Sequence, residues 1–277
     1  MELHPEWLKK YMEISKSNVF ELLNITGARP SKDFGQNFLI EPTICNKIAD
    51  VLVTNESDDI LEIGPGLGSL THFLLQKPGK LTCVDVDAKM ISILETIYKV
   101  SKVNLVLNDV RKIDLEPYSK IIGNLPYNIT TELIVFLLEK ATNCKQFVFM
   151  IQAEALNRFV ELKGKDYGPA SVLIHLLGSI KKQFIVRAGS FYPAPKCNSV
   201  VFEINVEDKY PRELVLEVYK LAKKLFLNRR KTLMNNLSNA CGKEKAVEIF
   251  QKLDIPETAR IEEISPENIL EIYKLTK

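Results

Sequence analysis

The stretch Glu62-Ile63-Gly64-Pro65-Gly66-Leu67-Gly68 decides the fold of this chain, because it places alternate glycines between two kinds of segment. The apolar run Ile60–Ile63 leads into it, and a helix-like segment begins near Leu70. Glycines at such a place let the backbone turn tightly and approach a ligand closely. The spacing differs from the G-x-G-x-x-G of dinucleotide-binding proteins. We therefore expect a strand, a ligand-binding turn and a helix, with a ligand of another kind.

Strand-like and helix-like segments alternate around this turn, from about Asp59 to Val206. Short β-branched or apolar runs are separated by longer stretches, such as residues 131–139, that carry a helical apolar face. This pattern is typical of βαβ proteins with a mostly parallel sheet. The expected fold class is α/β, with a Rossmann-like sheet followed by a small all-helical domain. The expected strands are residues 60–63, 81–85, 104–107, 121–123, 146–151, 184–186 and 200–204.

A polar segment after residue 206 marks the expected end of the sheet domain, because only helical patterns follow it. Residues 209–277 hold 14 Lys and Arg against 10 Asp and Glu, about +4 (14 − 10), whereas the whole chain carries +2. The first thirty residues predict a short amphipathic helix pair that includes Trp7. We expect an N-terminal helical extension at 1–30, a ligand-binding domain at 31–206 and a basic, RNA-contacting helical domain at 207–277.

Composition excludes several classes of protein. Hydrophobic residues make up 46% of the 277 residues and charged residues 26%, as in ordinary folded soluble proteins. The five cysteines form no C-x-x-C pair and there are three histidines, so we expect neither a disulfide framework nor a metal site. No signal peptide and no apolar run near the roughly 18 residues of a membrane span is present. We expect a cytoplasmic monomer without membrane attachment.

Two acids follow the next two expected strands. Asp85 lies 21 residues beyond Gly64, where a carboxylate can accept hydrogen bonds from a ribose diol, and Asp87 competes for this role. Asp109 and Val110 follow the third strand and suit recognition of an adenine amine by side chain and backbone. Taken singly, each acid would be read as a solvated residue at a strand end. Their order after the glycine turn instead favours a nucleoside cofactor at the carboxyl ends of the strands.

The tetrapeptide Asn124-Leu125-Pro126-Tyr127 follows the apolar pair Ile121-Ile122. An exocyclic adenine amine is a weak nucleophile, because its lone pair is delocalised into the ring. The Asn124 oxygen and the Pro126 carbonyl could accept both amine hydrogens and localise that lone pair, while Tyr127 stacks on the base. The tetrapeptide thus predicts a methyl-acceptor site for adenine. The alternative is an ordinary strand-to-helix turn, with Thr130 or Thr131 capping the next helix.

With these motifs in place, the chain resembles the KsgA-type ribosomal RNA adenine dimethyltransferases over about residues 30–270. The glycine turn resembles their S-adenosylmethionine loop, and the acceptor tetrapeptide matches together with its flank Asn128-Ile129. The other matching stretches are Gly35-Gln36-Asn37-Phe38-Leu39, Gln152-x-Glu154, Tyr167-Gly168, Phe191-Tyr192-Pro193-Ala194-Pro195-Lys196 with Ser199, and Arg229-Arg230-Lys231-Thr232-Leu233 with Asn236-Leu237.

The resemblance implies a class I S-adenosylmethionine methyltransferase that dimethylates two adjacent adenosines near the 3′ end of small-subunit (16S) rRNA, in a partly assembled subunit. It implies cofactor contacts from the Asn37 side chain and the Leu39 backbone. It also implies that Phe191 forms a second wall of the adenine slot, although a plain core position would explain this residue too. The implied cofactor residues are Asn37, Leu39, Gly64, Gly66, Gly68, Asp85, Asp109, Val110 and Asn124, and the implied catalytic residues are Asn124, Pro126, Tyr127 and Phe191.

The basic run of the helical domain has two interpretations. Arg229, Arg230 and Lys231, with Lys223 and Lys224, could bind RNA phosphates. The same residues could also be an ordinary solvated helix face. The sequence does not decide between them.

Several departures from the family pattern concern RNA contacts more than catalysis. Asp85 replaces the usual Glu, Cys197-Asn198 replaces Val-Asp, and Ala153 replaces a basic residue. Two alternative functions stay open: a large-subunit rRNA methyltransferase of the macrolide-resistance type, and a non-catalytic assembly or transcription factor with the same fold. The proline signature Pro193-x-Pro195-Lys196 favours the small-subunit reading over the first, and the intact acceptor tetrapeptide argues against the second.

Overall fold

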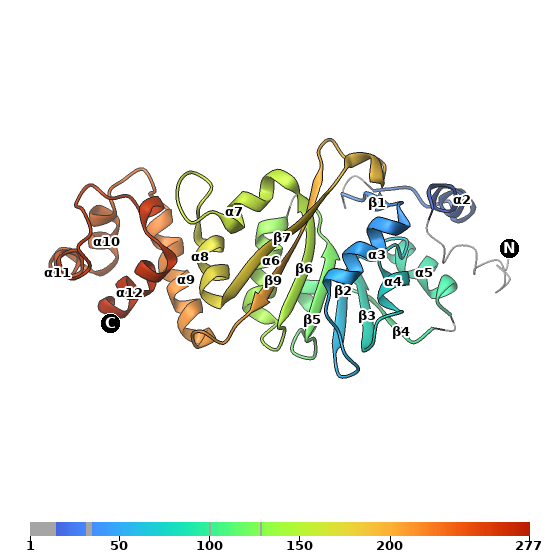
Figure 1. The fold of residues 1–277 in the computed structure, drawn as a ribbon, viewed down its shortest axis with the longest axis horizontal. Helices are drawn as coiled ribbons and strands as arrows, with labels where there is room; N and C mark the ends of the chain where they lie inside the picture. The colour runs from blue at the N-terminus through green and yellow to red at the C-terminus, as the bar shows by residue number, and fades with distance from the viewer. Residues whose placement is uncertain (1–14, 32–34, 100, 128) are drawn as a thin grey trace. The chain divides into compact units, whose positions relative to one another are not determined.

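The computed structural model of the 277-residue chain describes residues 15–31, 35–99, 101–127 and 129–277 (Figure 1). Within these residues seven strands form the central sheet, in the order β4-β3-β2-β5-β6-β9-β7. The pairs β4-β3, β3-β2, β2-β5 and β5-β6 are parallel, which confirms the expected α/β fold. The strands are β2 (Asp59–Ile63), β3 (Lys80–Asp85), β4 (Val103–Leu107), β5 (Lys120–Asn124), β6 (Gln146–Gln152), β7 (Gly178–Val186) and β9 (Ser199–Val206).

The order of the strands reverses at β2. From β2 the chain adds β3 and then β4 on one side, and afterwards returns to add β5 and β6 on the other. Register pairs Ile63 of β2 with Gly123 of β5, so the glycine turn and the acceptor tetrapeptide leave the sheet side by side. In open α/β sheets, the carboxyl ends of the strands at such a reversal form a crevice for ligands.

Glycine is required at position 123 by this close packing. A Cβ there would lie 2.7 Å from the Ile63 carbonyl oxygen, closer than real Cβ contacts allow. The absence of a side chain therefore lets β5 deliver Asn124 next to the glycine turn.

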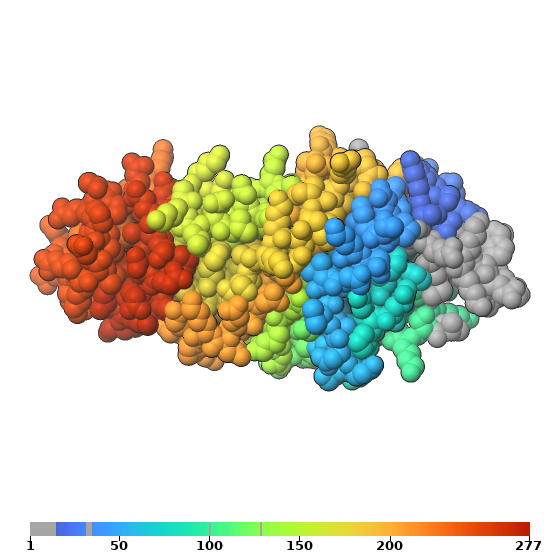
Figure 2. All heavy atoms as spheres, viewed as in Figure 1, coloured from blue at the N-terminus to red at the C-terminus, as the bar shows by residue number. Residues whose placement is uncertain are grey.

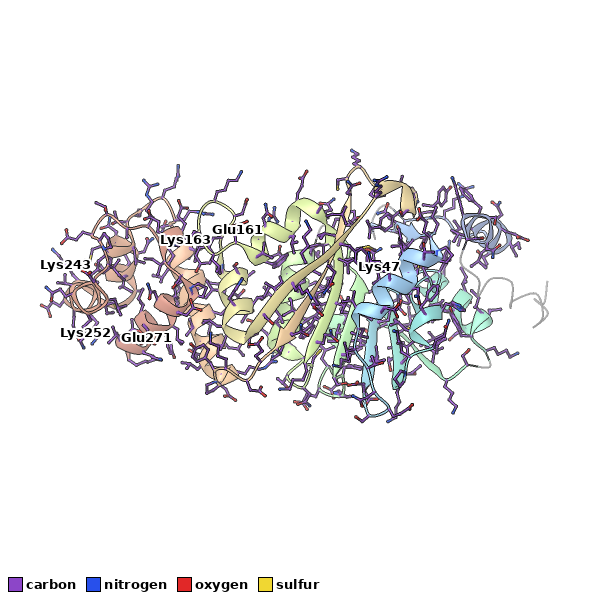
Figure 3. All side chains as sticks on the ribbon, viewed as in Figure 1. Lys47, Glu161, Lys163, Lys243, Lys252 and Glu271 are labelled. Atoms are coloured by element: carbon purple, nitrogen blue, oxygen red, sulfur yellow. The ribbon has the colours of Figure 1, made fainter. Side chains whose placement is uncertain are left out.

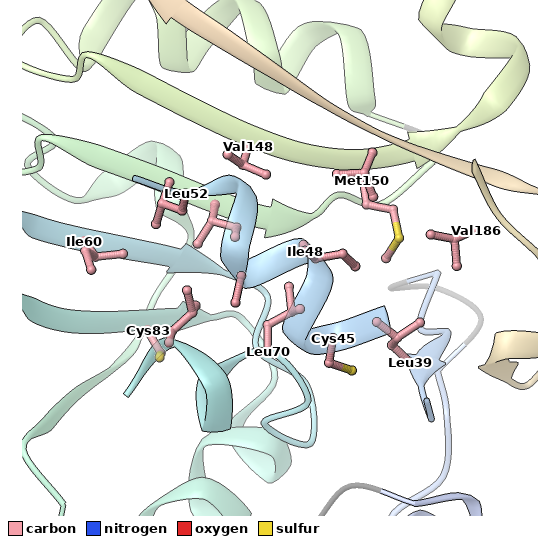
Figure 4. Packing of buried hydrophobic residues seen from close by; sticks show 14 of the residues in the cluster. Leu39, Cys45, Ile48, Leu52, Ile60, Leu70, Cys83, Val148, Met150 and Val186 are labelled. Carbon is pink, nitrogen blue, oxygen red and sulfur yellow. The ribbon is translucent and has the colours of Figure 1, made fainter. Parts of the chain in front are cut away.

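One face of the sheet is covered by α3 (Pro42–Val51), as Figure 4 shows. Cys45 and Ile48 of this helix, with Leu52 directly after it, pack with Ile60 of β2 and Val148 of β6 in a single buried cluster. The continuous apolar runs of the central strands are explained by burial of this kind. Three further helices lie between the strands from β2 to β6: α4 (Thr71–Leu74), α5 (Ala88–Ile97) and α6 (Thr130–Lys140).

A second buried cluster joins the N-terminal segment to the sheet domain. Helix α2 (Lys16–Thr26) begins at Ser15, whose side chain caps it, and ends at Gly27 with φ 62°. Its buried residues Val19, Leu22 and Leu23 pack with apolar residues of α5. The expected first half of the helix pair, including Trp7, lies outside the described residues.

Two short strands that the sequence did not predict form a separate antiparallel pair. They are β1 (Phe38–Leu39) and β8 (Phe191–Tyr192), with Leu39 paired to Phe191. Strand β7 (Gly178–Val186) also begins six residues before the expected strand at 184–186. The added part contains the exposed Lys181 and Lys182, so it lacks a continuous apolar run.

The chain divides into two compact units, residues 1–153 with 181–203 and residues 154–180 with 204–277. The second unit contains the expected C-terminal helices, and its spheres are mainly orange and red in Figure 2. It also includes residues 154–180, since α8 packs against α9 and Tyr167 meets Phe226 edge-on at 5.2 Å. The three-part division at residues 30 and 206 stays a prediction. The helices of this unit are α7 (Asn157–Val160), α8 (Pro169–Leu177), α9 (Arg212–Phe226), α10 (Leu233–Cys241), α11 (Lys243–Leu253) and α12 (Pro266–Thr276).

Across the described ranges of the chain, none of the helices has the length and apolar character needed to cross a lipid bilayer.

Candidate active site

A cavity of about 440 Å³ lies at the carboxyl ends of the central strands, within the first unit. Its size falls in the usual range for small-molecule sites, roughly 300–1,000 Å³. Most of the residues predicted for the cofactor and the acceptor meet there, although they come from separate strands and turns. The predicted residues that line it are Asn37, Gly64, Gly66, Asp85, Asp109, Val110, Asn124, Pro126 and Tyr127.

The glycine turn forms one wall of the cavity. Gly66 has φ 56°, in the left-handed region, and a Cβ on it would lie 3.1 Å from the Phe38 ring. Glycine is therefore needed both for the turn and for the approach of Phe38. The Gly66 amide donates a hydrogen bond to Asp85 at 3.4 Å, which links the turn to the end of β3.

Asp85 and Asp87 have different surroundings, and these favour Asp85 for a ligand. Asp85 lines the cavity; burial raises its pKa, and the amides of Asp87 and Gly66 oppose this rise. Asp87 instead caps α5 through the Lys89 amide at 2.9 Å and accepts a hydrogen bond from Gln36 at 2.8 Å. Both carboxylates accept hydrogen bonds from the protein, so what separates them is that Asp85 lines the cavity and Asp87 does not.

Glu62, the acid ahead of the glycines, does not line the cavity. It is 1% exposed and accepts hydrogen bonds from the Thr71 hydroxyl at 2.6 Å and the Cys83 thiol at 3.3 Å. Burial raises the pKa of Glu62 to about 7, and the hydrogen bonds from Thr71 and Cys83 limit the rise. Since Thr71 begins α4, Glu62 ties the helix after the turn to the strand before it.

Asp109 lines the cavity but its carboxylate is already paired. The Arg111 guanidinium donates to Oδ1 at 3.0 Å and to Oδ2 at 2.6 Å, and the Arg111 amide donates to Oδ1 at 2.9 Å. These hydrogen bonds hold the pKa of Asp109 below its ordinary value. Asp109 is therefore a fixed carboxylate that can still accept a further hydrogen bond.

The orientation of the Asn124 amide follows from its neighbour. Its Nδ2 donates to the Asn37 carbonyl at 3.3 Å, and a carbonyl can only accept. The amide oxygen of Asn124 is thus left for another partner. Asn37 in turn donates its own Nδ2 to the Gly35 carbonyl at 3.0 Å, so the Gly35–Leu39 motif holds the acceptor residue in place.

The Pro126 carbonyl, which was predicted to accept an amine hydrogen, is already hydrogen-bonded within the protein. The Pro126 carbonyl accepts hydrogen bonds from the Thr130 hydroxyl at 2.9 Å and from the Ile129 amide at 3.4 Å, because it serves the first turn of α6. The Leu125 carbonyl accepts none from the residues that the structure describes. Leu125 itself lines the cavity.

Tyr127 is held by a residue of the proline signature. Its hydroxyl lies 3.1 Å from the hydroxyl of Ser199, which is fully buried. Burial raises the pKa of Tyr127, and the Ser199 hydrogen bond opposes this rise. The contact gives a physical reason for a serine three residues after Lys196, and it fixes the ring in the cavity wall.

Three predicted residues do not line the cavity. Phe191 is 3% exposed and packs with Leu39 in the cluster under α3, so its position here is that of a core residue. Leu39 pairs with Phe191, and its carbonyl accepts a hydrogen bond from Ser69 at 2.7 Å. Gly68 accepts a hydrogen bond from the Tyr98 hydroxyl at 3.3 Å. Their predicted ligand contacts stay predictions.

The sequence analysis missed several residues that line the cavity. Val86 is the clearest, because it is 48% exposed although valine is normally buried. Its place directly after Asp85 was the available signal. Asn108 and Arg111 flank Asp109 in the same way. Val84 and Leu133 were also missed. The other lining residues were quoted only as members of matching motifs, without a role in the site: Gly35, Gln36, Phe38, Ile63, Leu125 and Ile129.

Another hollow, of about 730 Å³, lies beside α2 in the same unit. It shares Gly35, Gln36 and Asn37 with the first cavity, and Phe20 and Tyr192 stand in its wall with ring centroids 4.1 Å apart. It contains neither the glycine turn nor the acceptor tetrapeptide. The chemistry predicted from the motifs therefore belongs to the smaller cavity.

The basic run of the second unit is split by the structure. Arg229 is bound to Glu262, with Nη2 to Oε2 at 2.7 Å, and to the carbonyls of residues 164 and 165. Arg230 and Lys231 are exposed, as are Lys223 and Lys224. Lys223 lies over the Tyr219 ring at 4.5 Å. Among the described residues, no group of three or more His, Cys, Asp or Glu side chains could hold a metal ion.

Comparison with known proteins places this geometry in a family. A family model described as ribosomal RNA adenine dimethylase matches residues 27–277. A protein of Malacoplasma penetrans named ribosomal RNA small subunit methyltransferase A is 37% identical over 250 residues, 87% of this chain and 90% of that protein. A protein of the same name from Mesoplasma florum is 35% identical over 261 residues, 89% of this chain and 98% of that protein.

Solved structures show the same fold. A dimethyladenosine transferase from Plasmodium falciparum superposes with a TM-score of 0.73 at 24% identity, over 84% of this chain and 94% of that one. The 23S rRNA methyltransferase ErmE superposes with a TM-score of 0.69 at 19% identity, over 86% of this chain and 99% of that one. These two structures show the fold, whereas the family is shown by the match over residues 27–277 and by the relatives above 30% identity. The chain belongs to the ribosomal RNA adenine dimethylase family.

Proposed function

We propose that this chain transfers two methyl groups in succession from S-adenosylmethionine to the exocyclic amine of adenine, on two adjacent adenosines near the 3′ end of small-subunit rRNA. The single observation that carries the proposal is a pair of acceptors to which none of the described residues donates, the Asn124 amide oxygen and the Leu125 carbonyl, in the wall of the cavity that Asp85 and Asp109 also line. Family membership and the names of the relatives support the small subunit as the source of the RNA.

The cavity wall fits an adenosine-bearing cofactor. Asp85 offers a carboxylate for a ribose diol, and the exposed Val86 beside it offers an apolar face for an adenine ring. Asp109 and the Val110 backbone lie on the same wall for an adenine amine. When bound, S-adenosylmethionine supplies an electrophilic methyl group on its sulfonium. The turn around Gly66 leaves room for the backbone to approach it.

The acceptor residues act by positioning. Asn124 is held by Asn37, so its oxygen can accept one amine hydrogen without reorienting. We assign the second acceptor to the Leu125 carbonyl in place of Pro126, because the Pro126 carbonyl is engaged by Thr130. Two fixed acceptors localise the amine lone pair and align it for transfer, which is catalysis by orientation. The methylated nitrogen is cationic and acidic, so its proton can leave to water and no general base is needed.

Tyr127 supplies the stacking surface for the target base. A base held in this way must leave its helix or come from a loop. The Ser199 hydrogen bond keeps the ring from turning into the space that the base would occupy. The role proposed for Phe191 as an opposite wall requires this side chain to leave its place beside Leu39. Exclusion of water by closely packed rings would also favour transfer to the base.

Transfer assays test this proposal. Small ribosomal subunits lacking adenine dimethylation are incubated with the chain and labelled S-adenosylmethionine, with large subunits in parallel. We expect label in the small subunits only. Label in the large subunits instead would assign the chain to the macrolide-resistance activity. Binding of cofactor and subunits without any transfer would leave an assembly factor.

A further inference from the structure

The loop between α7 and α8, residues 161–168, is fastened to the C-terminal helices by Arg229, within the second unit. The guanidinium donates to the carbonyl of Lys165 at 2.8 Å and of Gly164 at 3.0 Å. On its other side it donates to Glu262 through Nε at 3.0 Å and Nη2 at 2.7 Å. The Gly164 amide also donates to the Glu262 carbonyl at 3.0 Å. Arg229 thus links the loop to the C-terminal part, and we call these hydrogen bonds of Arg229 the bracket.

This bracket places cations from two distant segments on neighbouring loops. Lys163 and Lys165 are exposed on the fastened loop, where Figure 3 labels Lys163 beside Glu161. Arg230 and Lys231 are exposed directly after Arg229 in the chain. In the part of the chain that the structure describes, no acid lies within ion-pair distance of these four side chains.

The acids nearby leave a positive balance. Glu161 and Asp166 are on the same loop, and Glu262 is engaged by Arg229. With Arg229 balanced by Glu262, residues 161–166 and 227–231 hold four other cations against two acids, so these two segments carry about +2 (4 − 2). Two leucines are also exposed on these loops, Leu162 at 39% and Leu227 at 80%. Cations interspersed with apolar side chains suit a nucleic-acid backbone, where phosphates alternate with riboses.

We propose that residues 161–166 and 227–231 form one RNA-backbone contact surface, the bracketed surface. Lys163, Lys165, Arg230 and Lys231 meet phosphates, and Arg229 is a positioning residue that holds the loop without touching RNA. This rests on the proposed function, whose rRNA substrate supplies the partner. It changes the predicted phosphate patch, because it removes Arg229 from the contacts and adds two lysines that lie about 65 residues earlier in the chain.

Salt dependence of binding tests the bracketed surface. The full chain is titrated with small subunits lacking adenine dimethylation, and with their protein-free rRNA, at several salt concentrations. Each phosphate contact contributes roughly 0.7–0.9 to the slope of log affinity against log salt. We expect Lys163→Ala/Lys165→Ala and Arg230→Ala/Lys231→Ala each to lower that slope by about 1.5 and to weaken binding about tenfold, on both probes. The matched control is Lys243→Ala/Lys252→Ala on α11, in the same unit, which should bind like the wild type (Figure 3).

The role of Arg229 is tested by a change that leaves its charge in place. Glu262→Gln weakens the bracket but removes no cation, so we expect weaker binding with the same control intact. Arg229→Met should make the Lys163→Ala/Lys165→Ala effect largely disappear, because the loop is then no longer held. Independent, additive losses from Arg229→Met and the lysine pair would show that Arg229 is itself a phosphate contact. Thermal unfolding checks that each variant is folded.

Other outcomes would overturn the surface itself. Wild-type affinity in both double variants, or equal losses in the α11 control, would contradict it. Losses seen with whole subunits but not with protein-free rRNA would mean that the surface docks a ribosomal protein. The proposed function fails separately: a wild type that binds with this salt dependence but transfers no methyl group would refute the activity and leave the surface standing.

Discussion

The acceptor tetrapeptide at 124–127 and the basic run at 229–231 are both short motifs, but the structure treats them differently. In the first, Asn124, Leu125 and Tyr127 all face one cavity, because the strand end and the following helix fix each direction. In the second, Arg229 turns inward to Glu262 while Arg230 and Lys231 stay exposed. A motif whose chemistry needs several atoms at once predicts its own geometry, whereas a run of like charges does not say which member is structural.

Among the substitutions that test this comparison, Asn124→Ala should have the largest effect, on the rate of methyl transfer. It removes the acceptor oxygen and the hydrogen bond to Asn37. Loss of one preorganised hydrogen-bonding group at a reacting centre typically costs about 10²–10³ in rate. We expect a single-turnover methyl-transfer rate, at saturating cofactor, lower by about that factor. Asn46→Ala, at an exposed position on α3, is the control. A fall below tenfold would remove Asn124 from the acceptor site.

Asp85→Asn tests the cofactor wall of the same cavity. Hydrogen bonds to charged groups contribute about 1.5–3 kcal/mol, so we expect S-adenosylmethionine affinity to fall roughly 10–100-fold in calorimetry. Asp87→Asn is the matched comparison, since asparagine can still cap α5. Its affinity should stay within about threefold. The reverse ranking would transfer the ribose contact to Asp87.

Tyr127→Ala and Tyr127→Phe separate stacking from the hydrogen bond to Ser199. Stacking of a base on an aromatic ring is worth about 1–3 kcal/mol, and a neutral hydrogen bond about 0.5–1.5 kcal/mol. We expect the alanine variant to lose about tenfold or more in kcat/KM for subunits, and the phenylalanine variant to lose less. Ser199→Ala should resemble Tyr127→Phe. Equal losses in the alanine and phenylalanine variants would show that the hydroxyl matters and the ring does not.

Measurements of stability can test whether Arg229 is structural while Arg230 is not. The two variants to compare are Arg229→Ala and Arg230→Ala. Arg229→Ala leaves Glu262 and two carbonyls without their donor, so we expect a loss above about 1 kcal/mol in the free energy of unfolding. Arg230→Ala should change it by less than about 0.5 kcal/mol, as exposed substitutions usually do. Urea denaturation measures both. Similar values for the two variants would erase the distinction between bracket and contact.

Glu62→Gln tests the buried acid that supports the cavity, through pH. The folded state keeps the Glu62 proton up to about pH 7, whereas an ordinary Glu releases it near 4.5. The folded state therefore binds more protons between these values, and this contribution to stability falls as pH rises from 4.5 to 7. A glutamine side chain cannot titrate, so the stability of Glu62→Gln relative to wild type should rise over that window. Parallel stability curves for the two proteins would show that Glu62 is not neutral.

The parallel core of the fold was predictable because its strands are continuous buried runs. The expected residues 60–63, 81–85 and 146–151 differ from β2, β3 and β6 by one residue at an end. The first part of β7 was not predictable, since an edge strand with exposed lysines lacks that pattern. The β1 and β8 pair was missed because each strand has only two residues and its partner lies far away in the sequence.

The same distinction holds for the site. The spacing of residues along the chain predicts which of them reach the cavity, whereas packing determines what their atoms contact. Asp85 and Asn124 follow strands, so topology alone brings them to one edge of the sheet. The direction of the Pro126 carbonyl depends on the Thr130 hydroxyl folding back to it. The burial of Phe191 depends on pairing with Leu39. Contacts of this kind have no signature in the sequence of either partner.

The central claim is that the Asn124 and Leu125 oxygens prepare an adenine amine for two successive transfers, through both N–H groups in the first and through the one remaining N–H in the second. Mass spectrometry of nucleosides from small subunits treated with the chain and S-adenosylmethionine tests it most directly. We expect N6,N6-dimethyladenosine at two adjacent positions near the 3′ end, preceded in time by the monomethyl nucleoside. A product methylated on another atom or another base, or no product from a wild type that binds both substrates, would contradict it.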